Sequence, residues 1–170
     1  MGNGSKKKVK NVISYIEGDL FAAIKDKKNT IVLPHICNSK KAWGAGFVVP
    51  LGKHYPKAKE VYLSGSPQLG DTDFVECDNV IICNMVAQTL GGERPLYYQY
   101  LAKCMEAVAN RCFSIECYDA EYEIHAPAFG TNLAGGDFNI IKELIHDCWI
   151  RDLNAKVNIY YLPGTFLPPT

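Results

Sequence analysis

One stretch of the sequence, "HICNSKKAWGAG", combines side chains that could do chemistry with a glycine-rich loop. His35, Cys37 and Asn38 follow one another closely, and Trp43 comes directly before a Gly-Ala-Gly turn at 44–46. A glycine-rich loop that precedes a helix offers free backbone N–H groups and the positive end of the helix dipole, and both attract phosphate. The stretch therefore predicts a phosphate-binding loop beside a polar pocket in which His35 could move a proton.

A second stretch, "APAFGTNLAGGD", repeats this combination nearer the C-terminus. Its glycines at 130 and 135 have the spacing of a Walker A loop, but Gly136 and Asp137 stand where that motif has Lys and Ser or Thr. The first stretch likewise lacks the third glycine of Gly-x-Gly-x-x-Gly. An Asp at this place would repel a terminal phosphate, but it could act as a base or polarise a water. Neither loop therefore matches a common nucleotide motif.

The elements that must position these loops are strands that alternate with helices. Strands are expected at residues 11–18, 30–36, 79–88, 121–130 and 156–163, and helices at 19–28, 46–63 (with a second start at Pro56), 94–113 and 137–153. The runs at 30–36 and 79–88 are almost wholly apolar, as in strands buried on both faces. Such alternation predicts right-handed crossovers, a mostly parallel sheet, and a ligand beyond the carboxyl ends of the strands.

Composition limits the class of protein. The chain has 170 residues, of which 48% are hydrophobic and 21% charged, as in an ordinary globular domain. Its 18 basic and 18 acidic residues balance, so no basic field for nucleic acid is expected. We find no apolar run long enough to cross a membrane and no signal peptide. We expect a flexible basic arm at residues 1–10 and one domain at 11–170.

The cysteines bear on compartment and metal content. All seven are scattered along the chain, without Cys-x-x-Cys pairs and without zinc-ligand spacing to the four histidines. Such a pattern is typical of reduced, mostly buried thiols. It predicts a cytoplasmic protein with no metal site and no cofactor.

Four stretches, in this order, resemble the macro domain: "IEGDLF", "LPHICNSKKAWGAGFVVPLGKHYPKAKEVY", "NMVAQ" and "APAFGTNLAGGDF". The resemblance covers residues 11–163 and is closest to the branch of ADP-ribose 1''-phosphate phosphatases and ADP-ribosyl-glutamate hydrolases. It implies a three-layer α/β/α fold with a mixed, mostly parallel central sheet. It also implies a monomeric, metal-independent phosphatase that binds ADP-ribose and acts on ADP-ribose 1''-phosphate.

The resemblance further implies a role for each loop. Asp19, followed by Leu20, would accept a hydrogen bond from the adenine amino group. Asn38 would hold the distal ribose, which Asn84 or Gln88 could also touch, and Trp43 would wall the pocket. The diphosphate would lie between two loops, formed by Gly44, Ala45, Gly46 and Phe47 and by Gly130, Thr131, Asn132, Leu133, Ala134 and Gly135. His35 and Asp137 would face the anomeric carbon as catalytic residues.

Structural roles and other functions stay open for several of these residues. Asp19 and Asp137 each precede an expected helix and could be plain N-caps, and His35 could be a satisfied core histidine. Cys37 is expected to be an inert buried thiol, because no Arg follows at Cys-x5-Arg spacing. The alternative functions are a module that binds ADP-ribose without turnover and a de-ADP-ribosylase acting on protein carboxylates. The latter would use a lysine nucleophile, for which Lys53 is a candidate.

Overall fold

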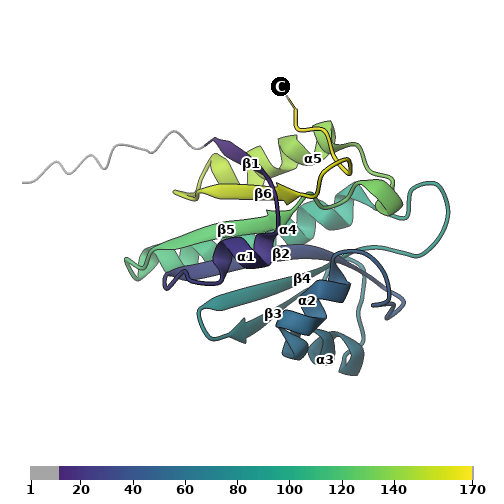
Figure 1. Ribbon diagram of the computed structural model, residues 1–170, viewed down its shortest axis with the longest axis horizontal. Helices are drawn as coiled ribbons and strands as arrows, with labels where there is room; N and C mark the ends of the chain where they lie inside the picture. The colour runs from purple at the N-terminus through teal and green to yellow at the C-terminus, as the bar shows by residue number, and fades with distance from the viewer. Residues whose placement is uncertain (1–11, 170) are drawn as a thin grey trace, which may run out of the picture.

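The fold is that of a mixed six-stranded sheet, seen in a computed structural model that describes residues 12–169. The basic arm expected at residues 1–10 lies outside the described residues. The strands lie in the order β1-β6-β5-β2-β4-β3 (Figure 1). Their bounds are β1 Ile13–Glu17, β2 Thr30–Asn38, β3 Thr72–Cys77, β4 Val80–Gln88, β5 Tyr122–Pro127 and β6 Val157–Tyr161. All neighbours pair in parallel except β3 and β4, which confirms the predicted mixed, mostly parallel sheet.

Helices cover both faces of this sheet. They are α1 Leu20–Ile24, α2 Val48–His54, α3 Pro56–Ser64, α4 Tyr98–Cys117 and α5 Phe138–Ile145, with short turns at η1 Asn132–Ala134 and η2 His146–Ile150. Successive side chains of a strand point to opposite faces. In β2, Val32 accordingly packs with residues of α4 and α5, whereas Ile31 and Leu33 pack with residues of α1, α2 and α3. These two cores on one sheet give the three layers that were predicted.

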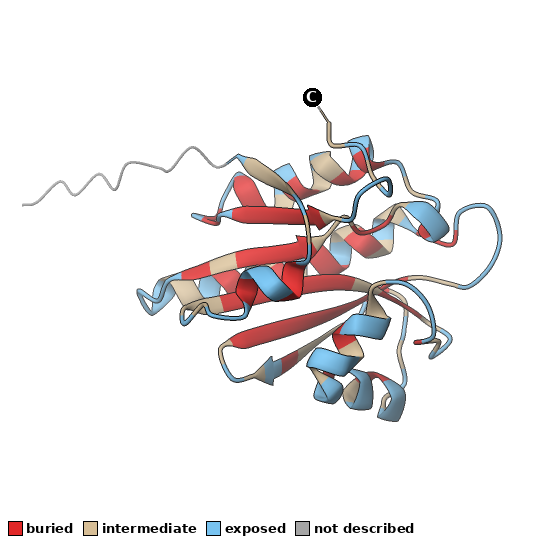
Figure 2. Ribbon diagram, viewed as in Figure 1, coloured by how far each residue is buried: buried red, intermediate tan, exposed pale blue. Residues whose placement is uncertain are grey.

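The centre of the sheet is its most buried part (Figure 2). Residues Val80–Ala87 of β4 are all buried, and so are most residues of β2. A strand covered by helices on both faces needs apolar side chains at nearly every position, which explains the two apolar runs in the sequence. None of the helices in the described part of the chain has the length and apolar character needed to span a membrane.

The sequence interpretation missed β3. This strand pairs antiparallel with β4 across a tight turn at Asp78 and Asn79, where Asp78 takes the left-handed conformation with φ 53°. Short Asp and Asn side chains tolerate that conformation better than most residues. β3 lies at the edge of the sheet and only Val75 is fully buried, so its hydrophobic pattern is weak.

Helix boundaries also differ from the sequence interpretation, and the helix expected over 19–28 is α1, which ends at Ile24. The helix expected from residue 94 begins at Tyr98, because Leu96 pairs as an extended residue with Gln88. The helix expected over 137–153 is α5 followed by the π-helical turn η2. In η2, the indole Nε1 of Trp149 donates a hydrogen bond to the Met105 carbonyl of α4 at 2.9 Å, which anchors the turn on its neighbour.

The parallel arrangement gathers the functional loops. The carboxyl ends of β1, β2, β4, β5 and β6 lie at one edge of the sheet, since these strands run in the same direction (Figure 1). The two glycine-rich stretches follow β2 and β5, and these strands are neighbours. The loops that the sequence analysis singled out are therefore brought side by side.

Candidate functional site

Two adjoining cavities open at this edge. The loop cavity, of about 610 Å³, is lined by the carboxyl end of β2 and by the loops after β2, β4 and β5. The α1 cavity, of about 600 Å³, is lined by the starts of α1 and α2 and by the segment after β6. Both include Gly46, Phe47, Pro127, Ala128 and Asn132 in their walls. The two cavities therefore adjoin and form one cleft, whose two parts have different linings.

Asn38 organises the first loop. Its side-chain Oδ1 accepts hydrogen bonds from the backbone N–H groups of Lys40 (3.0 Å) and Ala42 (3.1 Å), and its Nδ2 donates to the Ala42 carbonyl at 2.8 Å. The hydroxyl of Tyr62, from α3, lies 2.5 Å from the Asn38 backbone carbonyl oxygen and 2.9 Å from the same Oδ1, so its single proton is shared between these two acceptors. Asn38 and Ala42 line the loop cavity, as do residues 44–47. The amide therefore holds the turn that presents the Gly-Ala-Gly segment, and one of its N–H groups is left for a ligand.

Close contacts require glycine at several positions of the second loop, residues 130–136. Gly130 and Gly135 have φ of 82° and 73°, the left-handed region that favours glycine. A Cβ at Gly135 would lie 2.2 Å from the Glu93 carbonyl oxygen, and one at Gly136 would lie 2.3 Å from the Gly130 carbonyl oxygen. Residues 130–134 line the loop cavity, whereas Gly135 supports the turn from outside the lining. The glycines are thus needed for a tight turn packed against the β4–α4 loop.

The backbone of both loops is free to bind a ligand. In the described part of the chain, no hydrogen bond within the protein uses the N–H groups of residues 44–47 or 130–133. Both segments line the loop cavity. None of the side chains lining this cavity is Lys, Arg, Asp or Glu. The cavity therefore offers two rows of uncharged donors, which suit the oxygens of a phosphate group.

His35 lies at the wall of the loop cavity and is fully buried. Its Nε2 donates to the Oδ1 of Asn84 at 2.5 Å, and the Asn84 Nδ2 donates to the Ala58 carbonyl at 3.1 Å. Burial lowers the pKa of His35 to about 4, and the Asn84 hydrogen bond opposes this only in part. The imidazole is therefore neutral near pH 7. Asn84 reaches His35 and α3 and is absent from the lining of the loop cavity.

Cys37 fits its predicted structural role. The side chain is buried, and its Sγ lies 3.9 Å from the Nε2 of His35. Burial raises the pKa of the Cys37 thiol well above its ordinary value. A protonated thiol is a poor nucleophile, so the position of Cys37 beside the cavity does not make it a reactive group.

Asp19 and Asp137 are both helix N-caps. The Oδ1 of Asp19 accepts a hydrogen bond from the Phe21 N–H at 2.9 Å, and the Oδ1 of Asp137 accepts one from the Asn139 N–H at 2.9 Å. Asp19 also lines the α1 cavity, where its second carboxylate oxygen can meet a ligand. Asp137 lines neither cavity, and its own N–H donates to the Tyr98 hydroxyl at 2.8 Å.

The remaining predicted residues divide between the cleft and its surroundings. Leu20 lines the α1 cavity and Gln88 lines the loop cavity. Trp43 is buried against the rings of His35 and Tyr62 and lines neither cavity. Lys53 is exposed on α2 and is also outside both linings. The structure thus brings most of the predicted binding residues together, but leaves Trp43, Gly135, Asp137 and Lys53 around the cleft.

The aromatic residues of the α1 cavity other than Phe47 were missed by the sequence interpretation. Phe21 stacks on His54 with ring centroids 4.4 Å apart, and on Phe47 at 5.3 Å. Phe166 and Tyr160 complete the apolar wall. These residues come from α1, α2, β6 and the C-terminal segment, so no local motif marks them. The only signal in the sequence is that Phe21 follows Asp19 closely.

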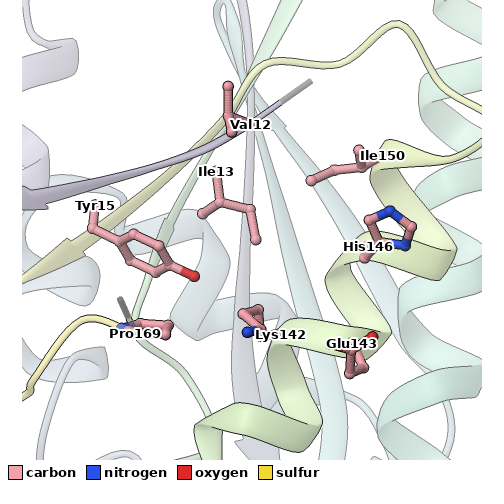
Figure 3. A pocket seen from close by; sticks show the side chains of 8 residues that line it. All are labelled: Val12, Ile13, Tyr15, Lys142, Glu143, His146, Ile150 and Pro169. Carbon is pink, nitrogen blue, oxygen red and sulfur yellow. The ribbon is translucent and has the colours of Figure 1, made fainter. Parts of the chain in front are cut away.

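A third hollow, of about 430 Å³, lies elsewhere and shares no residue with the cleft. It lies between β1 and the α5–η2 segment (Figure 3). Within residues 12–169, no group of three or more His, Cys, Asp or Glu residues is placed to hold a metal ion.

Comparison with known proteins gives the family. No model of a protein family matches the chain. An ADP-ribose 1''-phosphate phosphatase of Lodderomyces elongisporus is 40% identical over 156 residues, which are 85% of this chain and 98% of that protein. The chain belongs to the family of this phosphatase. A phosphatase of the same name from Candida albicans is 32% identical over 133 residues, 73% of this chain and 85% of the relative.

Solved structures of similar fold include macrodomains. A macrodomain protein from Streptomyces coelicolor is 27% identical, with a TM-score of 0.71 over 88% of this chain and 99% of its own. Thermosipho africanus DarTG, solved in complex with ADP-ribose, is 17% identical, with a TM-score of 0.72 over 96% of this chain and 44% of its own. At that identity the likeness concerns the fold alone. The comparisons confirm the macro-domain fold that the four motifs predicted.

Proposed function

We propose that this member of the family is an ADP-ribose 1''-phosphate phosphatase, which binds its substrate in the cleft and releases phosphate. The observation that carries this proposal is the pair of backbone segments, 44–47 and 130–133, whose free N–H groups line the loop cavity. A diphosphate between them would accept hydrogen bonds from both sides. The names of the Lodderomyces elongisporus and Candida albicans relatives support the same substrate.

The two cavities suit the two ends of ADP-ribose. The α1 cavity has an apolar aromatic wall and one carboxylate, that of Asp19. An adenine ring would bury its faces there and donate its amino hydrogen to Asp19. The distal ribose would then lie in the loop cavity near Asn38, Gln88 and His35. DarTG, which is similar to this chain in fold alone, was solved with the same ligand.

The chemistry requires a water that attacks either the phosphorus or the anomeric carbon. Either attack yields ADP-ribose and phosphate, and either requires a proton to leave the water. His35 is neutral and buried at the cavity wall, so we propose that it relays this proton rather than binding phosphate as a cation. Asp137 remains the second proposed relay. Its carboxylate lies at the N-terminus of α5, outside the lining, and would have to approach the substrate through a water.

A second candidate function is a binding module without turnover. The uncharged lining of the loop cavity favours it, because binding needs only the backbone donors. A de-ADP-ribosylase that uses Lys53 is less well supported, since Lys53 is outside both linings. We further propose a monomer without nucleic-acid or membrane partners. We also propose a cytoplasmic location, because all seven cysteines are free thiols.

The decisive experiment offers the purified protein two substrates side by side. One is ADP-ribose 1''-phosphate, with phosphate release as the readout, and the other is an ADP-ribosyl-glutamyl protein, with free ADP-ribose as the readout. We expect phosphate from the first and no ADP-ribose from the second. Tight binding of ADP-ribose without either product would establish the binding module instead. Release of ADP-ribose from the protein substrate would establish the de-ADP-ribosylase.

A further inference from the structure

The turn at residues 39–42 carries two adjacent lysines to the rim of the loop cavity. It begins after Asn38 and ends at Ala42, and both of these residues line the cavity. Lys40 and Lys41 between them are exposed. Lys41 has a φ of 58°, a conformation that few residues other than glycine adopt. The hydrogen bonds of the Asn38 amide to the turn stabilise this conformation, so the lysine backbone is held in one place.

The turn carries two positive charges beside the loop cavity, whereas the carboxylate of Asp19 lies in the α1 cavity and that of Asp137 outside both cavities. Neither Lys40 nor Lys41 takes part in an ion pair with a described residue. On the facing β4–α4 loop, Glu93 and Arg94 offset one another, and the Arg94 guanidinium lies over the Tyr98 ring at 4.7 Å. Since the loop cavity itself has no charged side chain, the two lysines, which lie between the lining residues Asn38 and Ala42, add positive charge beside it.

Substrate and product differ in charge at this end. The phosphate monoester of ADP-ribose 1''-phosphate adds a charge of about −1.5 to −2 near pH 7, whereas ADP-ribose has a hydroxyl group there. The diphosphate is common to both ligands, so its attraction to the lysines changes both affinities alike. A positive rim near the distal ribose therefore attracts the substrate more strongly than the product.

We propose that Lys40 and Lys41 recognise the terminal phosphate monoester and give the site its preference for ADP-ribose 1''-phosphate over ADP-ribose. The inference rests on the proposed function, since it assumes that the monoester is the natural ligand. The lysines are specificity-determining residues rather than catalytic ones. They attract the phosphate group from the rim and leave the water activation to groups inside the cleft.

The test compares two double variants that remove the same charge. Lys40→Gln/Lys41→Gln changes the rim, whereas Lys28→Gln/Lys156→Gln changes two exposed lysines just before β2 and β6, at the opposite edge of the sheet. For the rim variant we expect KM for ADP-ribose 1''-phosphate to rise about three- to tenfold at low salt, as for exposed charge pairs. The value of kcat and the Kd for ADP-ribose should change by less than about twofold, and the control variant should match the wild type in all three.

An ionic-strength series and a variant that restores the charges provide two further tests. Raising the ionic strength should weaken the preference of the wild type and leave that of the rim variant almost unchanged. Lys40→Arg/Lys41→Arg should restore the wild-type KM, because the charges return. Equal losses for ADP-ribose and its 1''-phosphate in the Gln variant would show that the turn only supports the cavity, and would overturn the inference. An unchanged KM would overturn it as well.

Failure of the proposed function is a separate outcome. If the wild type releases no phosphate, the phosphatase assignment is wrong, and the inference is then tested by equilibrium binding of the uncleaved 1''-phosphate. A wild type that binds this ligand more tightly than ADP-ribose, with the difference lost in Lys40→Gln/Lys41→Gln, would support the role of the lysines. Equal affinity of the wild type for both ligands would refute it.

Discussion

Replacement of Asp19 by Asn separates the two roles that this residue can have. Asp19 caps α1 through the 2.9 Å hydrogen bond from the Phe21 N–H, and it lines the α1 cavity. Asn caps a helix about as well as Asp, so the fold of Asp19→Asn should be kept. With the carbonyl of the new side chain engaged in the cap, however, its NH₂ group would face the adenine amino group, and two donors cannot bond to one another.

The size of the effect follows from the lost hydrogen bond. A hydrogen bond to a charged group contributes about 1.5–3 kcal/mol, so the Kd for ADP-ribose should rise by roughly 10- to 150-fold. Ribose 5-phosphate has no adenine, and its affinity should stay the same. Asp19→Ala would in addition remove the cap and lower the free energy of unfolding by about 1 kcal/mol, which is roughly 2–4 °C in Tm for a chain of this size.

Titration calorimetry with both ligands and thermal unfolding measure these quantities. Asp137→Asn is the matched control, because it makes the same change in another helix N-cap. The Oδ1 of Asp137 accepts a 2.9 Å hydrogen bond as that of Asp19 does, but Asp137 is exposed and lies outside both cavities. We expect ADP-ribose to bind this control as it binds the wild type. If Asp19→Asn binds ADP-ribose as tightly as the control does, Asp19 is a helix cap only, and the assignment of adenine to the α1 cavity is wrong.

Three further predictions concern catalysis, packing and pH. If Asp137 relays a proton, Asp137→Asn should lower kcat for phosphate release by about 10²–10⁴-fold with unchanged affinity for ADP-ribose; full activity would leave it a cap. Gly135→Ala should lower the free energy of unfolding by about 1–3 kcal/mol in urea titrations, because its Cβ would lie 2.2 Å from the Glu93 carbonyl oxygen; wild-type stability would mean that the loops move apart freely. The pKa of His35 is lowered from 6.5 to about 4 in the folded state. As the pH falls, the unfolded chain therefore binds a proton before the folded chain does. The free energy of unfolding should decrease by about 3 kcal/mol between about pH 6.5 and pH 4. Urea titrations should show this decrease in the wild type and a smaller one in His35→Gln. The pKa of Glu123 is lowered from 4.5 to about 2, so the contribution of Glu123 to the free energy of unfolding is lost mainly below about pH 4.

The sequence alone predicted which loops come together at the candidate site. The apolar runs at 30–36 and 79–88 identify strands that are buried on both faces, and such strands belong to a parallel sheet. Parallel strands place their carboxyl ends at one edge, so the loops that follow β2 and β5 have to be neighbours. The glycine-rich stretches at 44–46 and 130–135 could be predicted as parts of the site before any contact was known, because in such loops the backbone N–H groups themselves can bind a ligand; residues 44–46 and 130–134 do line the loop cavity.

Only the tertiary structure decided which way the side chains point and which distant segments meet. Trp43 is turned into the core against Tyr62, which lies on α3, and the carboxylate of Asp137 is bound to its own helix rather than to the cleft. The α1 cavity takes His54 from the end of α2 and Phe166 from the C-terminal segment, and no spacing in the sequence links them to Asp19. Loop side chains take the direction that packing against other elements leaves open, and that packing depends on contacts between residues far apart in the chain.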